Sequence, residues 1–343
     1  MRDLQDILKD KSESRFLYSV GRVRSLENRL LDRDILRDLI EAPSLKDIFN
    51  ELRDTEYGED VVETEENLDF ERLLSLATRS LIDLVDSFFP DPELTDLFVY
   101  PFDIQNLKML LKADLAGLPE PKDLFPLGRF PLPLLGQLAR EGSSTDLPPW
   151  VVNAVAGVRE MWKKIPKLRI VDAILDRALV ETQLRIAEEA QRPVLVAFFR
   201  HNIDTANVET FIRIRITERS REQFEQFFFP GGELQLGFYK NIWETSIREL
   251  GRIFENTPYH NMVVKSLEEY YTEGSLTMIE VEKARLMMEQ LAPARYITFG
   301  PEPVLAYFVT RLYEIRILRL IMVSRKNNLP VQELQKRVME YYG

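Results

Sequence analysis

Apolar residues recur every three or four positions along most of the chain, and almost no segment alternates strictly between apolar and polar residues. The first spacing is that of one face of an α-helix, and the second is that of a half-buried β-strand. The helical stripe is clearest within residues 16–31, 73–85, 170–184 and 243–254. Gly and Pro cluster between these segments, where they end helices. We therefore predict an all-α protein whose helices mostly have about 10 to 20 residues.

Three stretches of the sequence resemble one another, in the same order, at shifts of about 100 to 110 residues. The phrase Pro-Val-Leu at 193–195 recurs at 303–305. Further pairs align at similar shifts: Asp103 with Asp204, Asn106 with Asn207, Asp204 with Glu314, and Arg215 with Arg325. At twice that shift, the four residues 54–57 resemble 256–259. Such ordered similarity is typical of an internal repeat.

We predict three similar helical units of about 100 residues, each burying its apolar faces against its neighbours. Their expected boundaries are 1–115, 116–215 and 216–343. The residues expected to mark the repeated structural motif are Asp103, Asn106, Asp204, Asn207, Glu302, Glu314 and Arg316.

Asp103 and Asn106 carry side-chain oxygens three residues apart, which could hold a metal ion, transfer protons or begin a helix. Because Pro101 disfavours the α conformation in the residue before it, we expect a helix to begin at Asp103, with its carboxylate as the N-cap. In the third copy Ile317 stands where the others have Asn, which would break a metal pair. The repeat therefore favours a structural role, and a hydrolase that uses Asp103 and Asp204 remains an alternative.

The chain offers few other candidates for chemistry. It has no cysteine and only two histidines, His201 and His260, and neither has a metal-ligating partner three or four residues away. Glycine loops that bind phosphate are absent. We expect no catalytic residue, no cofactor and no metal.

The net charge of −11 is concentrated in residues 1–115, which hold 15 Lys and Arg against 27 Asp and Glu. This acidity disfavours binding to nucleic acid and suits a basic protein partner, although it also fits a solvated surface. A basic cluster at 163–169 (Lys163, Lys164, Lys167 and Arg169) could contact an acidic partner or simply end a helix. The longest uncharged run, 147–158, is too short to cross a bilayer. Since residues 1–15 lack the apolar core of a secretory signal, we expect a cytoplasmic protein.

Several phrases, taken together and in order, resemble one family. They are YSVGRVRSLENRLL near the start, LRDTEYG, FDIQNLKMLLKA, IDTANVETFIRIR, and the long segment FGPEPVLAYFVTRLYEIRILRLIMVSRKNNLP at 299–330. The chain is similar over nearly its whole length to the C subunit of archaeal and bacterial A/V-type rotary ATPases, which is related to the d subunit of eukaryotic vacuolar ATPases. It departs from the family pattern at Ile317, where Asn is common.

This resemblance implies three similar helical domains around a pseudo-threefold axis, forming a funnel. It also implies a non-catalytic central-stalk subunit that joins the shaft of D and F subunits to the membrane proteolipid ring, acts as a monomer within the complex, and binds no nucleotide or nucleic acid itself. A helical scaffold with unrelated partners is the alternative.

Helix ends and Gly/Pro loops shared by the three units are the expected contact surfaces. The candidate interface residues are Pro101, Phe125, Arg129, Phe229, Gly231, Gly232 and Phe299. The aromatic run at 227–229 is either a turn that faces the core or part of a contact patch.

Overall fold

The computed structural model describes residues 14–217 and 219–339, and every regular element in these ranges is a helix. Residues 1–13, which bear on the expectation of no secretory signal, lie outside the described part. The chain divides into two compact units. The terminal unit combines the residues up to Thr95 with those from His260 onward, and the central unit is Asp96–Tyr259. The predicted all-α fold is confirmed.

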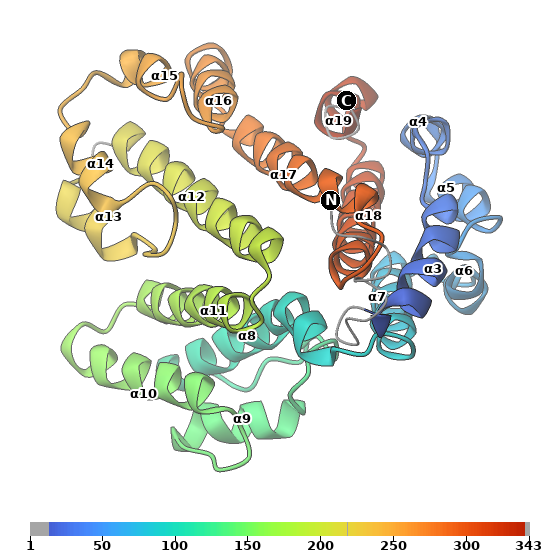
Figure 1. The fold of residues 1–343 in the computed structure, drawn as a ribbon, viewed down its shortest axis with the longest axis horizontal. Coiled ribbons are helices and arrows are strands. Elements are labelled where there is room, and N and C mark those ends of the chain that lie inside the picture. Colours follow the sequence, from blue (N-terminus) through green and yellow to red (C-terminus); the bar gives the residue numbers. More distant parts are fainter. Residues whose placement is uncertain (1–13, 218, 340–343) are drawn as a thin grey trace. The chain divides into compact units, whose positions relative to one another are not determined.

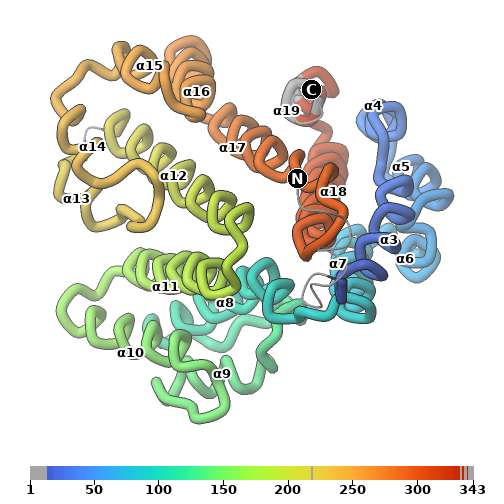
Figure 2. The backbone as a smooth tube through the Cα atoms, viewed as in Figure 1, coloured from blue at the N-terminus to red at the C-terminus, as the bar shows by residue number. Residues whose placement is uncertain are grey.

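The terminal unit brings helices from the first and last parts of the chain together around one long helix, α18 (Glu302–Lys326). This helix packs against α3, α5 and α7 from the N-terminal half, and α19 packs against α4 (Figure 2). The other helices of the terminal unit are α3 (Leu17–Leu26), α4 (Arg33–Glu41), α5 (Leu45–Leu52), α6 (Gly58–Thr64), α7 (Phe70–Asp86), α16 (His260–Glu273), α17 (Thr277–Leu291) and α19 (Val331–Met339).

The central unit contains a run of helices in which α11 packs against both α10 and α12 (Figure 1). Leu111, Leu138, Val155 and Leu175 are among the residues of one shared hydrophobic core. The helices are α8 (Pro92–Ala116, which begins in the terminal unit), α9 (Leu132–Glu141), α10 (Pro149–Lys164), α11 (Arg169–Glu189), α12 (Pro193–Ile216), α13 (Arg221–Phe227), α14 (Leu236–Asn241) and α15 (Leu250–Ile253).

Helix ends follow the chemistry of the sequence. Asp32, Ser44, Asp69 and Ser220 each accept a hydrogen bond from a backbone amide in the first turn of the helix that follows. Gly142 ends α9 in the left-handed conformation, with φ of 76°. Three helices, α8, α12 and α18, have 24 or 25 residues and exceed the predicted length.

The predicted helix start at Asp103 is wrong, because α8 begins at Pro92 and contains Pro101. A proline within a helix has no N–H for the carbonyl four residues earlier, here that of Leu97. The side chain of Gln183, on α11, donates a hydrogen bond to this carbonyl oxygen at 2.6 Å. A neighbouring helix therefore supplies the missing donor, and α8 continues through the proline with Asp103 in its interior.

None of the described helices is both long enough and apolar enough to cross a membrane.

Candidate functional site: buried carboxylates that hold loops

Asp103 and Asn106 hold a loop against α8. The backbone N–H groups of Arg129 and Phe130 donate to the two carboxylate oxygens of Asp103, at 2.9 and 3.0 Å. The Asn106 amide donates to the carbonyl oxygen of Phe125 at 2.7 Å and accepts from its N–H at 2.8 Å. Both side chains are at most 1% exposed. Asp103 therefore does accept backbone hydrogen bonds, but from a distant loop and not from the first turn of its own helix.

Asp204 and Asn207 repeat this arrangement in α12. The N–H groups of Glu233 and Leu234 donate to the Asp204 carboxylate, each at 3.0 Å. The Asn207 amide donates to the carbonyl oxygen of Phe229 and accepts from its N–H, both at 2.8 Å. The four bonds match those made by Asp103 and Asn106 in kind and in order.

A glycine fills the same place in each loop. A Cβ atom added to Gly128 would lie 1.9 Å from Oδ1 of Asp103, and one added to Gly232 would lie 2.1 Å from Oδ1 of Asp204. Side chains do not approach one another this closely, so only glycine lets the backbone reach the carboxylate.

A tyrosine adds a third donor to the Asp204 carboxylate. The hydroxyl group of Tyr259 donates to Oδ2 of Asp204 at 2.8 Å. Tyr259 follows a turn in which the hydroxyl group of Thr257 donates to the carbonyl oxygen of Phe254 and accepts from the Tyr259 N–H. Burial and the nearby carboxylate raise the pKa of Tyr259, so its hydroxyl group remains a donor.

The terminal unit contains another buried carboxylate, Glu314 of α18, and two of its partners come from the first part of the chain. The N–H of Leu31 donates to Oε2 at 2.7 Å, and the hydroxyl group of Tyr57 donates to Oε1 at 2.6 Å. Arg311, one helical turn earlier, forms an ion pair with the same carboxylate. Tyr57 follows a threonine turn built like that before Tyr259.

Two arginines aligned by the repeat also make the same kind of contact. Arg215, near the end of α12, donates to the carbonyl oxygen of Thr245 at 2.7 Å. Arg325, near the end of α18, donates to that of Ile40 at 2.8 Å. The C-terminal end of α12 therefore contacts a segment that follows it in the sequence, and that of α18 contacts a segment near the start of the chain. Both helices also hold a distant segment through the carboxylate near their centre.

Burial raises the pKa of the Asp103 and Asp204 carboxyl groups. Loss of hydration raises the pKa of Asp103 to about 6, and the two backbone donors partly oppose this effect. The pKa of Asp204 is raised for the same reason, while the Tyr259 hydroxyl group and two backbone donors lower it in part. Since N–H or O–H donors of the protein occupy both oxygens of each carboxylate, the geometry is that of an anchor for a loop. No group of three or more potential metal ligands occurs within the described residues 14–217 and 219–339.

The other predicted residues are more scattered. Glu302 is 8% exposed at the start of α18, whereas the Arg316 side chain is 72% exposed and lies 3.6 Å from Glu280. Of the candidate interface residues, Pro101 is exposed and Gly232 is buried. The rest are partly buried: Phe125, Arg129, Phe229, Gly231 and Phe299.

The tyrosine and loop partners of the carboxylates were not predicted from the sequence. The only signal was the similarity of 54–57 to 256–259, which places Tyr57 and Tyr259 at equivalent positions. In the aromatic run, Phe228 is buried against Phe224 and Tyr239, while Phe227 lines a surface pocket. One residue of the run therefore faces the core and its neighbour does not.

Comparison with known proteins agrees with the resemblance seen in the sequence. A family model described as ATP synthase (C/AC39) subunit matches residues 19–337. The C subunit of the V-type sodium ATPase of Enterococcus hirae is 22% identical, over 93% of this chain and 97% of its own. The C subunit of the A-type ATP synthase of Methanocaldococcus jannaschii is 24% identical over 93% and 85%, and that of Pyrococcus abyssi is 21% identical over 95% and 90%. The predicted membership is confirmed: the chain belongs to the ATP synthase C/AC39 family.

Proposed function

We propose that this chain is a non-catalytic rotor subunit of a V/A-type ATPase, a socket that joins the D–F central shaft to the cytoplasmic face of the membrane proteolipid ring. The observation that supports this most is the family match over residues 19–337. In this role the protein passes torque between the ATP-hydrolysing head and the ion-translocating ring, and it makes and breaks no covalent bond.

A socket under torque has to resist deformation, and the buried anchors supply this resistance. Each of the helices α8, α12 and α18 carries a carboxylate whose hydrogen bonds fix a segment distant in sequence, such as Arg129 and Phe130 on Asp103. Fully satisfied buried polar groups give rigidity, and close-packed interiors transmit strain. The proposal therefore assigns Asp103, Asp204 and Glu314 a mechanical role.

One anchored carboxylate occurs in each of α8, α12 and α18, which favours three repeated units. In the proposed arrangement these units would lie around a pseudo-threefold axis and form a funnel. The proposed units are residues 1–115, 116–215 and 216–343. Because Leu31 and Tyr57 bind Glu314, the first and last segments would share one anchor. The loops at 125–129, 229–232 and 299–302 are the proposed contact surfaces toward the shaft or the ring.

Binding of the purified chain to its partners tests this function. The full chain should bind a purified D–F shaft complex and the detergent-solubilised proteolipid ring, and should not bind ATP on its own. Mutation of Pro126, an exposed residue of the loop at 125–129, to glutamate should weaken at least one of these interactions, with Lys122→Glu as an exposed control of the same unit. If the chain binds neither shaft nor ring, the alternative of a helical scaffold with unrelated partners is favoured.

A further inference from the structure

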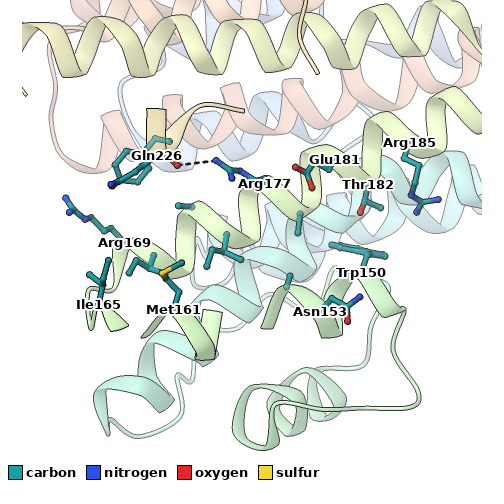
Figure 3. A pocket seen from close by; sticks show the side chains of 16 residues that line it. Trp150, Asn153, Met161, Ile165, Arg169, Arg177, Glu181, Thr182, Arg185 and Gln226 are labelled. Carbon is teal, nitrogen blue, oxygen red and sulfur yellow. Dashed lines mark hydrogen bonds between the residues drawn. The ribbon is translucent and has the colours of Figure 1, made fainter. Parts of the chain in front are cut away.

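The central unit contains an elongated surface groove of about 740 Å³, lined by α10 and α11 and by the end of α13 (Figure 3). The lining residues of α11 run from Arg169 to Arg185. At 1.5 Å per residue this stretch is about 24 Å long, or between four and five helical turns. The groove is thus longer than a compact small-molecule pocket requires.

The groove exists because the apolar face of α11 is wider than the part of it that is fully buried in the core. Val171, Leu175 and Leu179 belong to the hydrophobic core. Ile170 and Ile174, which lie beside them in sequence, are only partly buried and line the groove, and Ile174 also packs against the core. The sequence places all of these positions on one broad helical face, so part of its apolar surface remains accessible along the groove.

Small residues on the floor of the groove leave room for a second helix to pack closely. Ala173 and Ala178 also line it along α11, and small residues let a second helix lie near the first. Along α10, Met161 lines the groove and is 38% exposed; Ile165, just beyond the helix end, also lines it and is 43% exposed. Exposed apolar residues gathered in one groove are typical of an interaction site.

The wall formed by α13 is held in place by the protein itself. The guanidinium group of Arg177 donates to the carbonyl oxygen of Gln226 at 3.2 Å (Figure 3) and to that of Phe228 at 3.0 Å. The guanidinium group of Arg169 lies over the ring of Phe227, 5.9 Å from its centroid. The groove is therefore preformed, which lowers the entropic cost of binding.

The charges around the groove select the partner. Along α11, the lining contains three arginines and a single acid, Glu181, although Arg185 is paired with Glu189 at 2.8 Å. The end of α10 and the turn that leads into α11 add Lys163 and Lys167, both of which are exposed. A basic rim around an apolar floor complements a ligand with an apolar stripe flanked by acidic residues.

We propose that this groove binds an acidic amphipathic helix of a partner protein, of about four turns, with its apolar stripe on Ile170 and Ile174 and its acidic residues toward Lys163, Lys167 and Arg169. Recognition follows the helix-in-groove mode, in which apolar anchors recur every three or four residues. The inference depends on the geometry of the central unit and not on the proposed rotor function.

The absence of cysteine in the chain makes a direct test simple. In the full chain, Met161→Cys carries an environment-sensitive fluorophore in the groove, and Leu118→Cys carries the same fluorophore at a site that is 63% exposed in the native chain and is not among the groove residues. The probe ligand is a helical peptide of about 18 residues with leucine at every third and fourth position and glutamate beside this stripe. Its control has lysine in place of each glutamate.

We expect the acidic peptide to shift the fluorescence at position 161 and not at 118, and to bind at least about tenfold more tightly than the basic peptide. The double substitution Lys163→Glu and Lys167→Glu should remove this preference, whereas Lys122→Glu should preserve it. The proposal is overturned if the two peptides bind equally, if neither binds, or if the label at position 118 responds as strongly. A response that depends on protein concentration without peptide would instead assign the groove to a second copy of this chain.

Discussion

The anchor on Asp103 predicts an unusually large cost for replacing Gly128 with alanine. The new Cβ would lie 1.9 Å from Oδ1 and 2.5 Å from Cγ of Asp103. Normal contact requires a shift of more than about 1 Å, because real Cβ contacts are seldom closer than 3.4 Å. Such a shift breaks the hydrogen bonds from Arg129 and Phe130 and leaves a buried carboxylate without its donors.

The loss of two such bonds to a buried charged group costs about 3 to 6 kcal/mol. For a unit of this size, that corresponds to a decrease of roughly 10 to 20 °C in melting temperature. The matched control is Gly157→Ala within α10, where the nearest atom would be Cγ2 of Ile174 at an ordinary 3.8 Å. This substitution should stabilise the protein by up to about 1 kcal/mol, since alanine favours a helix over glycine.

Urea unfolding followed by circular dichroism, together with scanning calorimetry, measures both variants. The two substitutions are chemically identical and are expected to have opposite signs. A Gly128→Ala variant as stable as the native chain, or a Gly157→Ala variant that loses as much stability as Gly128→Ala, would refute the argument that the loop is held by direct contact with the carboxylate.

Three further predictions concern the same anchors. Tyr259→Phe should decrease the free energy of unfolding by about 1 to 3 kcal/mol, because Asp204 loses a donor. The control Tyr296→Phe, at a side chain that is 80% exposed, should change it by less than about 0.5 kcal/mol. Equal effects of the two substitutions in urea titrations would contradict this. Asn106→Asp should cost about 2 to 4 kcal/mol, since it removes the donor to a backbone carbonyl and adds a buried charge, and a thermal melt unchanged at pH 8 would count against the proposed geometry. Because the pKa of Asp103 is raised to about 6, the folded chain binds more protons than the unfolded chain between about pH 4 and pH 6. The contribution of this group to stability therefore falls by about 3 kcal/mol as pH rises through this range, and it is constant above it. In unfolding titrations across that range, the slope of the free energy of unfolding against pH should be more positive for Asp103→Asn than for the native chain; an identical slope would show that the carboxyl titrates normally.

The helical period was enough to predict the fold class, because burial of apolar stripes determines where helices form. The position of Asp103 was predicted wrongly for an equally physical reason. The rule for the residue before a proline is a local preference, and here tertiary packing outweighs it. Gln183, a residue of another helix, offsets the separate cost of the donor missing at Pro101. Nothing in the local sequence indicates that compensation.

The partners of Glu314 could not be predicted from the sequence either. Leu31 and Tyr57 are more than 250 residues away along the chain, and only packing brings them to the carboxylate. The same limit applies to α11, where the spacing of Ile174 and Leu175 shows a wide apolar face but not which part of it the core covers. Periodicity predicts that a surface is apolar, and the tertiary structure decides whether it is buried.

The central claim, that this chain couples shaft rotation to ion movement without chemistry of its own, is tested most directly in a reconstituted rotary complex. ATP hydrolysis and ATP-driven ion uptake into vesicles are measured with the complete complex, with the chain left out, and with the chain added back. The account predicts that hydrolysis persists without the chain, that ion uptake is lost, and that uptake is restored when the chain returns. Ion uptake that continues at the full rate without the chain would contradict it.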